Sequence, residues 1–252
     1  MTAPVFLGEP GALDGLVAGG SYLLGGAEGR HAGVVQRRAP GERVDVVDCA
    51  GTRLVGEVAE VGPDGVRLLV REIVVEPVGA PRLVLVQALA KGDRDELAIE
   101  AATEVGVDAV VPWQAERSIV VWRGDRAAKS RARWLGTVRA AAKQSRRAHV
   151  PEVELALDGG ALVRRVRQTV EAGGAVLVLH EEASAPLATV PLPGTGDLVV
   201  VVGPEGGISE RELAGLLDAG AVAVRLGPHV LRTSTAGPVA LALLAQRLGR
   251  WA

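Results

Sequence analysis

Two glycine-marked segments near the end of the chain carry the residue types best suited to hold a ligand. The first reads Gly-Pro-Glu-Gly-Gly-Ile at residues 203–208, and the second spans residues 226–235; each follows an apolar run. Glycine permits backbone angles and close approaches that a side chain forbids, so the amides of such segments can face a ligand. Within the segments, Glu205 and Arg232 are charged side chains that could act on it.

The common phosphate-binding fingerprints are absent from both segments. Neither GxxxxGK[ST] nor GxGxxG occurs there, and the first segment holds an acid but no lysine, which disfavours a triphosphate. A ligand with an adenosine, a carboxylate and a sulfonium cation, namely S-adenosylmethionine, suits exposed amides, an apolar bed and carbonyl oxygens. The alternative that these residues leave open is a plain connection between a strand and a helix.

The elements that must position these segments alternate between apolar strands and helices. From Arg82 onward, short apolar runs predict strands at residues 83–86, 109–111, 175–179, 198–202 and 221–226. Helices are predicted near residues 94–105, 127–147, 160–172, 209–219 and 235–248. This alternation predicts an α/β fold with a parallel sheet, whose ligands bind at the carboxyl ends of the strands. Both glycine segments and the pair Leu179-His180 lie at such ends, so we expect one pocket with three walls.

Local signals predict how two of the helices begin. Ser209 followed three residues later by Glu212 has the spacing of a capping box. The Ser/Thr cluster at residues 233–235 is predicted to cap the last helix.

The first 75 residues predict a small β-rich domain. Extended runs at residues 5–7, 22–24, 44–49, 52–59 and 66–75 are separated by turn residues, which indicates a barrel or meander. Residues 28–38 are predicted to form one short helix, and residues 76–81, rich in proline and glycine, a linker to a second domain at residues 82–252. Cys49 is expected in the core.

Composition bounds the remaining properties. One cysteine and four dispersed histidines predict neither a disulfide framework nor a metal site. No basic stretch followed by an apolar one opens the sequence, and no run of about 18 apolar residues occurs, so we expect a soluble cytoplasmic protein.

Residues 123–149 hold nine basic side chains and one acid, against 19 basic and 29 acidic elsewhere. This asymmetry favours a polyanion-binding face, with a solvated helix face as the alternative.

Several motifs together resemble one family. VVGPEGGISERE followed by RLGPHVLRTSTA is similar to the C-terminal signature of SPOUT methyltransferases, and AKGDRDEL, ATEVGV and QSRR extend the match upstream. The chain thereby resembles the bacterial 16S ribosomal RNA (uracil-N3)-methyltransferases, the RsmE family. Relatives often carry glutamate where this chain has Ser234, and Glu-Gln-Ser-Gly-Arg where it reads Lys-Gln-Ser-Arg-Arg at residues 143–147.

The resemblance implies the fold, the reaction and the partners. We expect a PUA-like barrel at residues 1–75, a SPOUT domain with a trefoil knot at about residues 175–252, and a homodimer formed by that domain. The implied reaction methylates N3 of a uridine in the 16S ribosomal RNA of the 30S subunit, with S-adenosylmethionine as cofactor. The implied cofactor site comprises Leu179, His180, Gly203, Glu205, Gly206, Gly207, Ile208, Leu226, Gly227, Pro228, Leu231, Arg232, Thr233 and Thr235.

Residue chemistry adds roles within that expectation. Arg232 is predicted to stabilise the uracilate by donating to a carbonyl oxygen; its alternatives are a helix cap or an ion pair with Glu205. Glu205 is the candidate base, although it could serve structurally, and His180 and His229 are weaker candidates. The residues predicted to contact RNA are Arg30, His31, Arg37, Lys91, Arg94, Gln144, Arg146 and Arg147. Trp113, Trp122 and Trp134 could stack on bases, but buried packing is the favoured interpretation.

Overall fold

The computed structural model describes residues 3–251, and its contacts divide them into two compact units. The first unit comprises the residues up to Val78 together with Ala142–Val150, and the second comprises Gly79–Ala141 and the residues from Pro151 onward. The placement of residues 142–150 depends on contacts far apart in sequence. One of them is the hydrogen bond that His149 Nε2 donates to the Glu76 carbonyl oxygen (2.6 Å).

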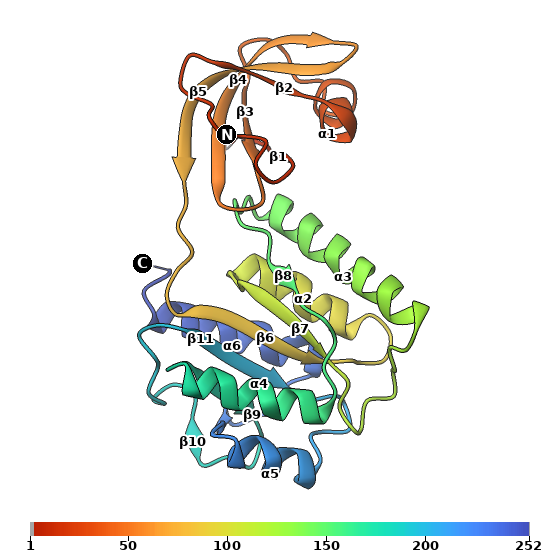
Figure 1. Cartoon of the computed structure of the whole chain (residues 1–252), viewed down its shortest axis with the longest axis vertical. Coiled ribbons are helices and arrows are strands. Elements are labelled where there is room, and N and C mark those ends of the chain that lie inside the picture. Colours follow the sequence, from red (N-terminus) through yellow and green to blue (C-terminus); the bar gives the residue numbers. More distant parts are fainter. Residues whose placement is uncertain (1–2, 252) are drawn as a thin grey trace. The chain divides into compact units, whose positions relative to one another are not determined.

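Five strands form the sheet of the first unit, as the extended runs predicted (Figure 1). They are β1 (Val5–Leu7), β2 (Ser21–Leu24), β3 (Arg43–Val47), β4 (Thr52–Gly62) and β5 (Gly65–Val75). Their order is β1-β3-β4-β5-β2, with β1 parallel to β3 and the other pairs antiparallel. The alternation of apolar and polar residues buries Phe6, Leu54 and Leu68 in the core of this unit.

A short helical segment follows β2. Helix α1 (Gly26–Arg30) continues into the π-helix η1 (His31–Val35), so the helix predicted over residues 28–38 begins and ends earlier than expected. It cannot extend through Arg37, whose φ of 53° lies in the left-handed region. Cys49 is also not a core residue. It is half-buried at a turn with φ of 66°, and its Sγ donates to the Gly8 carbonyl oxygen.

The sheet of the second unit has seven strands, and every neighbouring pair is parallel. They are β6 (Arg82–Ala88), β7 (Ala109–Trp113), β8 (Glu152–Val153), β9 (Ala175–Leu179), β10 (Ala185–Pro186), β11 (Asp197–Val202) and β12 (Val222–Arg225). Their order is β10-β12-β9-β11-β6-β7-β8. The parallel α/β sheet is therefore confirmed, while the two-residue strands β8 and β10 were not predicted because neither has an apolar run.

Helices connect these strands close to the predicted positions. They are α2 (Arg94–Val105), α3 (Asp125–Gln144), α4 (Gly159–Glu171), α5 (Glu210–Asp218) and α6 (Thr233–Arg247). Helices α4 and α5 pack on one face of the sheet and α2 and α6 on the other (Figure 1). Burial on both faces explains why the strand sequences lack polar alternation.

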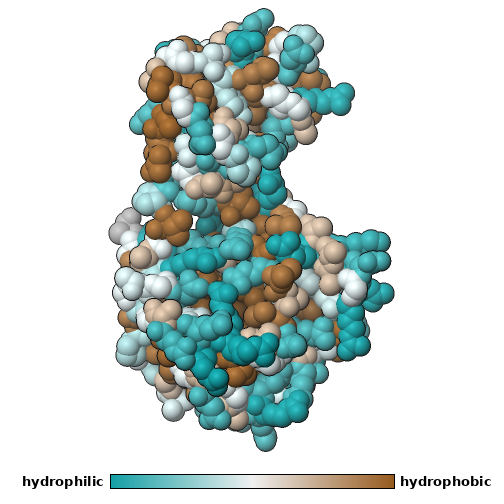
Figure 2. Space-filling model, in the orientation of Figure 1, coloured by the Kyte–Doolittle hydropathy of each residue, from teal (hydrophilic) through white to brown (hydrophobic). Residues whose placement is uncertain are grey.

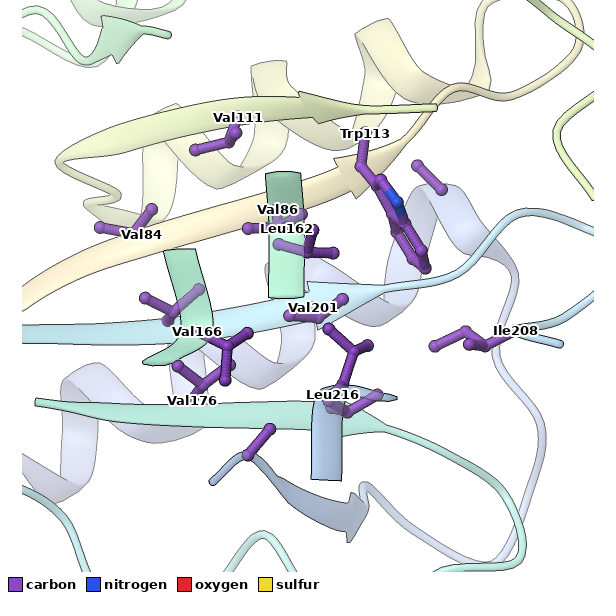
Figure 3. Close-up of a cluster of buried hydrophobic side chains, with 14 of the residues drawn as sticks. Val84, Val86, Val111, Trp113, Leu162, Val166, Val176, Val201, Ile208 and Leu216 are labelled. Atoms are coloured by element: carbon purple, nitrogen blue, oxygen red, sulfur yellow. The ribbon is translucent and has the colours of Figure 1, made fainter. Parts of the chain in front are cut away.

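The core under α4 and α5 reaches the carboxyl ends of the strands. Leu162 and Val166 of α4 and Leu216 of α5 pack on valines of the central strands. Figure 3 shows Trp113, at the end of β7, and Ile208, in the first glycine segment, pointing into this cluster. The glycine segment is thus anchored on the hydrophobic core of the second unit.

No helix among residues 3–251 is long and apolar enough to cross a membrane. On the side drawn in Figure 2, the coloured residues show hydrophobic side chains in small patches among hydrophilic ones.

Asp95, in the first turn of α2, is a buried carboxyl group with a testable effect on stability. Its side chain is 2% exposed, and burial raises its pKa to about 6 despite a hydrogen bond from the Glu96 backbone N–H (2.9 Å). Because the folded state binds this proton more tightly than the unfolded state, Asp95 should lower the free energy of unfolding as pH rises from about 4 to about 6. Asp95→Asn should therefore stabilise the protein by roughly 3 kcal/mol at pH 8 and much less at pH 4.

Urea denaturation at pH 4, 6 and 8 measures this difference. Asp93→Asn is the control, because Asp93 is an exposed carboxylate at the same end of α2. A stabilisation by Asp95→Asn that is equal at all three pH values would contradict the titration of Asp95 as its source.

Candidate functional site

Three loops meet at the carboxyl ends of adjacent strands, as the sequence predicted. They follow β9, β11 and β12 and line a single cavity of about 730 Å³. Of the fourteen residues predicted to hold a cofactor, all but Thr235 line this cavity. The volume falls in the range of pockets that bind ligands of nucleoside size. The fold therefore brings the three loops together, whereas the chemical role of each residue stays a prediction.

Glycine is required at two positions of the loop after β11. Gly207 has φ of 72°, in the left-handed region that disfavours other residues. At Gly203, an added Cβ would lie 2.7 Å from Cγ1 of Ile208, which is buried in the core cluster. Helix α5 then begins with the predicted capping box, in which Ser209 accepts from the Glu212 backbone N–H and Glu212 accepts from the Ser209 backbone N–H. These features fix the loop close to the sheet.

Glu205 is held by partners from the loop between β6 and α2. Its Oε1 accepts from Arg94 Nη1 (2.7 Å) and from the Lys91 backbone N–H (3.1 Å). Partial burial by itself raises the pKa of Glu205, but hydrogen bonds from its own backbone N–H and from Arg94 outweigh burial and lower that pKa. A low pKa and an ion pair favour a structural role for Glu205 over the role of a base.

Arg117 is a second cation that holds the same loop, and it is not among the site residues predicted from the sequence. Its Nη1 donates to the Gly206 carbonyl oxygen (3.0 Å), and it lines the cavity. The sequence pattern could have indicated Arg117, because it follows the carboxyl end of β7 and ligand-binding residues of parallel sheets lie at such ends. The cavity is also lined by Arg94, Glu181, Glu182, Glu210 and Arg225.

The loop after β12 is joined to the loop after β11 by one threonine. Thr233 Oγ1 donates to the Gly203 carbonyl oxygen (2.8 Å) and accepts from Gln87 Nε2 (2.9 Å), and both Thr233 and Gln87 are buried. Helix α6 begins at Thr233 and its N-terminus has no side-chain cap. The predicted cap by the Ser/Thr cluster is therefore wrong, because the Thr233 hydroxyl bonds across to Gly203 instead.

Arg232 is an exposed cation in the wall of the cavity. Within residues 3–251, its guanidinium makes no hydrogen bond and no ion pair. The alternative in which it pairs with Glu205 is wrong, because Glu205 bonds Arg94, and the alternative of a side-chain cap is wrong because the N-cap residue of α6 makes no such bond. Its five N–H groups are available to a ligand.

The two histidines of the cavity differ in their partners. His180 Nδ1 accepts from the Glu182 backbone N–H (3.3 Å), so the neutral imidazole carries its proton on Nε2. His229 is exposed in the loop after β12. His180 is thereby oriented as a wall of the cavity, and its bonded Nδ1 is not available as a proton acceptor.

The residues predicted to contact RNA fall in both units. In the first unit, Arg30, Arg37, Gln144 and Arg146 are exposed, whereas Arg147 is half-buried. His31 is half-buried against Phe6, with ring centroids 5.9 Å apart. In the second unit, Lys91 is exposed and Arg94 pairs with Glu205.

Much of the positive charge of residues 123–149 has internal partners. Lys143 Nζ donates to both carboxylate oxygens of Glu28 (2.8 and 2.9 Å). Arg131 donates to the carbonyl oxygens of Val153 and Glu154, and Arg133 pairs with Glu96 (2.6 Å). The number of charges open to a polyanion is therefore smaller than the sequence suggests.

The arrangement of the cavity suits a ligand with both polar and apolar parts. Leu179, Leu226, Leu231 and Ile208 supply apolar surface, and the glycine loop supplies backbone groups. Carboxylates and an unpaired guanidinium lie in the same cavity, so it can hold a cationic group and stabilise a developing negative charge. Among residues 3–251, no group of three or more His, Cys, Asp or Glu could hold a metal ion.

Sequence and fold both match known proteins over nearly the whole chain. A family model described as an RNA methyltransferase domain matches residues 79–245. The chain is 50% identical over 234 residues to ribosomal RNA small subunit methyltransferase E of Mycobacterium bovis, which covers 92% of this chain and 89% of that protein. It is 33% identical over 232 residues to the protein of the same name from Bacillus subtilis, covering 89% and 90% of the two chains.

A solved structure extends the similarity to the fold. The crystal structure of ribosomal RNA small subunit methyltransferase E from Neisseria gonorrhoeae, bound to S-adenosyl methionine, aligns with a TM-score of 0.83 at 28% identity. The alignment covers 98% of each chain.

Proposed function

Because this chain belongs to the RNA methyltransferase family of ribosomal RNA small subunit methyltransferase E, we propose that it methylates N3 of a specific uridine in 16S ribosomal RNA. It is a ribosomal RNA methyltransferase that uses S-adenosylmethionine. The observation that carries the proposal is the cavity at the ends of β9, β11 and β12, which combines a glycine loop with the unpaired Arg232.

The residues of the three loops fit this cofactor. Leu179, Leu226 and Ile208 form apolar walls for the adenine ring, and the carbonyl and carboxylate oxygens near the glycine loop suit the cationic sulfonium and ammonium groups. Arg94 and Arg117 hold the glycine loop in place through Glu205 and the Gly206 carbonyl oxygen. When bound, the cofactor supplies an electrophilic methyl group.

Chemistry at uridine N3 requires the loss of a proton. N3 is a poor nucleophile until it is deprotonated, and deprotonation leaves a negative charge shared with the carbonyl oxygens. Arg232 donates hydrogen bonds to one of these oxygens, which lowers the cost of forming the uracilate. Once the N3 proton has left to solvent, N3 would form a bond to the methyl carbon that the bound cofactor supplies, while the methyl–sulfur bond breaks and its electron pair stays on sulfur.

Two of the candidate bases of the cavity, Glu205 and His180, are poorly suited to accept the N3 proton. Glu205 has a lowered pKa and pairs with Arg94, and His180 uses Nδ1 to accept a backbone hydrogen bond. We therefore assign Glu205 to holding the glycine loop, and the rate depends mainly on how well Arg232 stabilises the deprotonated base.

RNA contacts are proposed on both units. The five-stranded first unit is proposed as the PUA-like domain, with exposed Arg30, Arg37, Gln144 and Arg146 as its RNA contacts. The substrate is proposed to be 16S ribosomal RNA within the 30S subunit. The proposed location is the cytoplasm, where ribosomes are assembled.

The trefoil knot and the homodimer are proposals of the same kind. The strand order supports the SPOUT knot. Strand β9 lies between β11 and β12 in the sheet, so the chain crosses over β9 on its way from β11 to β12. Helix α6, which follows β12, then packs against β11 and β6. What supports a dimer through the C-terminal domain is the exposure of Val239 and Leu243, one turn apart on α6.

Mass spectrometry of 16S ribosomal RNA tests the function directly. Incubation of 30S subunits that lack the modification with protein and S-adenosylmethionine should add one methyl group to one uridine, and nuclease fragments should assign it to N3. Methylation at a carbon or a ribose hydroxyl would overturn the N3 assignment. No methyl transfer from a folded protein that binds the cofactor would overturn the proposed substrate.

Arg94 was predicted to contact RNA, and its ion pair with Glu205 leads to a different expectation. Arg94→Ala should weaken S-adenosylmethionine binding roughly three- to tenfold, because the glycine loop loses a charge-assisted hydrogen bond that is partly screened by solvent. RNA affinity should change less. Calorimetric titration with the cofactor and fluorescence anisotropy with RNA measure the two effects.

Lys91→Ala is the matched control for Arg94→Ala. Lys91 contacts Glu205 through its backbone N–H, so its side chain can be removed without breaking that bond. If Arg94→Ala reduced RNA affinity and left cofactor affinity at the wild-type value, the RNA-contact prediction would be correct and the positioning role wrong.

A further inference from the structure

A second cavity of about 600 Å³ lies in the C-terminal unit, separate from the cofactor cavity. We call it the α3 groove. One wall is the segment of residues 119–122, and the other is the first half of α3. The residues that line it are Ile119, Val120, Val121, Trp122, Arg126, Lys129, Ser130 and Arg133.

Aromatic packing holds the two walls together. Trp122 is buried at 7% exposure, and its ring meets that of Trp134 of α3 edge-on, with centroids 5.3 Å apart and an interplanar angle of 78°. This contact fixes the segment against the helix. Ile119, three residues before Trp122, is 74% exposed. An apolar side chain is therefore displayed on a rigid edge of the groove.

The cations of the groove differ in whether they are neutralised. Arg133 pairs with Glu96 of α2. Arg126 and Lys129 are exposed and, within residues 3–251, make no hydrogen bond or ion pair. They are three positions apart on α3 and so lie on the same side of the helix. Two uncompensated positive charges thus face solvent beside the exposed Ile119.

The groove begins next to the cofactor cavity. Arg117 lines the cofactor cavity and Ile119 lines the groove. One residue, Ser118, lies between them, so their Cα atoms are at most about 7 Å apart. That spacing is about the step between neighbouring phosphates of an extended nucleic-acid strand. A nucleotide adjacent to a base in the cofactor cavity can therefore reach the groove.

We propose that the α3 groove binds the single-stranded RNA next to the target uridine. Arg126 and Lys129 contact two backbone phosphates, and Ile119 packs against the face of one base. Cations combined with an exposed apolar surface are what single-stranded nucleic acid requires, because its bases and its phosphates both need partners. This inference rests on the proposed function and adds a binding site outside the cofactor cavity.

The test compares two double variants that remove the same charge. Arg126→Gln with Lys129→Gln should weaken binding of a 16S ribosomal RNA fragment containing the target uridine roughly tenfold at 0.1 M salt. The plot of log affinity against log salt concentration should have a slope that is shallower by about 1.4, as expected for the loss of two single-strand phosphate contacts. Fluorescence anisotropy over a salt series measures both quantities.

Arg164→Gln with Arg167→Gln is the matched control, since both arginines are exposed on α4 of the same unit. This variant should bind RNA as the wild type does. Ile119→Ser should weaken RNA binding without changing the salt slope, whereas Leu155→Ser, which alters an equally exposed apolar residue, should not. Calorimetry with S-adenosylmethionine verifies that each variant keeps its cofactor affinity.

Three outcomes would overturn the proposal. The α4 variant could lose as much RNA affinity as the α3 variant, which would mean a general charge effect. The α3 variant could bind RNA normally. Or it could lose affinity for 30S subunits alone, which would assign the groove to a ribosomal protein. The proposed function fails separately: a wild-type protein that binds RNA through the groove but transfers no methyl group would leave the groove proposal standing.

Discussion

Replacing Arg232 with alanine is expected to lower the rate of methyl transfer to 16S ribosomal RNA about 100- to 1000-fold. The guanidinium is exposed in the cofactor cavity and has no hydrogen-bond or ion-pair partner within residues 3–251, so its removal breaks no such bond in that part of the chain. The lost interaction forms mainly with the charge that develops on the uracil. The decrease should therefore appear in kcat, while the affinity for S-adenosylmethionine changes little. Single-turnover assays with saturating cofactor and RNA measure the chemical step.

Arg225 supplies the control for charge alone. It is also exposed and also lines the cavity, at the end of β12. Arg225→Ala removes the same charge from the same cavity and should reduce the rate much less. Arg232→Lys should recover part of the activity, because an ammonium group restores the charge but not the two-pronged donor geometry. Wild-type turnover by a folded Arg232→Ala protein would exclude the proposed role.

A pH profile separates stabilisation of the uracilate from base catalysis. If the N3 proton leaves to solvent, the rate should rise with pH up to the pKa of the bound uridine. Arg232→Ala should move that rise to higher pH, because the deprotonated base loses its stabilising donor. A profile governed instead by a carboxyl group with a lowered pKa, and abolished in Glu205→Gln, would identify Glu205 as the base.

The strands and helices were predictable because local residue patterns determine them. Continuous apolar runs predicted the buried strands β6, β7, β9, β11 and β12, and the spacing of Ser209 and Glu212 predicted the start of α5. The carboxyl-end rule for parallel sheets then placed the three loops in one cavity. Each of these inferences used residues close together in sequence or a general property of the fold class.

The contacts that fix the site could not be predicted, because they join distant parts of the chain. Thr233 was read as a local cap, but its hydroxyl bonds to Gly203, 30 residues away. An ion pair between Glu205 and Arg232 was the alternative to a catalytic role for Arg232, but Glu205 pairs with Arg94, 111 residues away. Sequence spacing ranks partners by proximity along the chain, whereas the parallel sheet brings together the ends of strands that are far apart in sequence.

The charge pattern of the sequence could not predict which basic residues are open to RNA, for a related reason. The basic segment at residues 123–149 looked uniform, but Lys143 and Arg133 are neutralised by glutamates from α1 and α2. Only three-dimensional neighbours distinguish a charge that holds the fold from one that is open to RNA. Arg126 and Lys129 are candidates for charges that are open to RNA, because within residues 3–251 neither makes a hydrogen bond or an ion pair.

Replacing Trp113 with alanine is expected to lower the free energy of unfolding by about 3 to 5 kcal/mol. The indole is fully buried at the end of β7 and packs in the cluster that contains Ile208 and Ala115 (Figure 3). Its loss leaves a cavity that the rigid parallel sheet cannot close. Since Ile208 anchors the glycine loop on that cluster, cofactor affinity should fall as well. Urea denaturation and calorimetric titration measure the two effects.

Trp113→Phe distinguishes packing from RNA stacking. Phenylalanine keeps an aromatic face and most of the apolar volume, and within residues 3–251 the indole Nε1 has no hydrogen-bond partner to lose. If packing is the role, Trp113→Phe should retain most of the stability and of the cofactor affinity. A base-stacking role would give the opposite pattern, with RNA affinity lost in Trp113→Ala and the urea midpoint unchanged. Complete burial of the ring excludes contact with a base in the folded protein, so we expect the loss of stability to dominate.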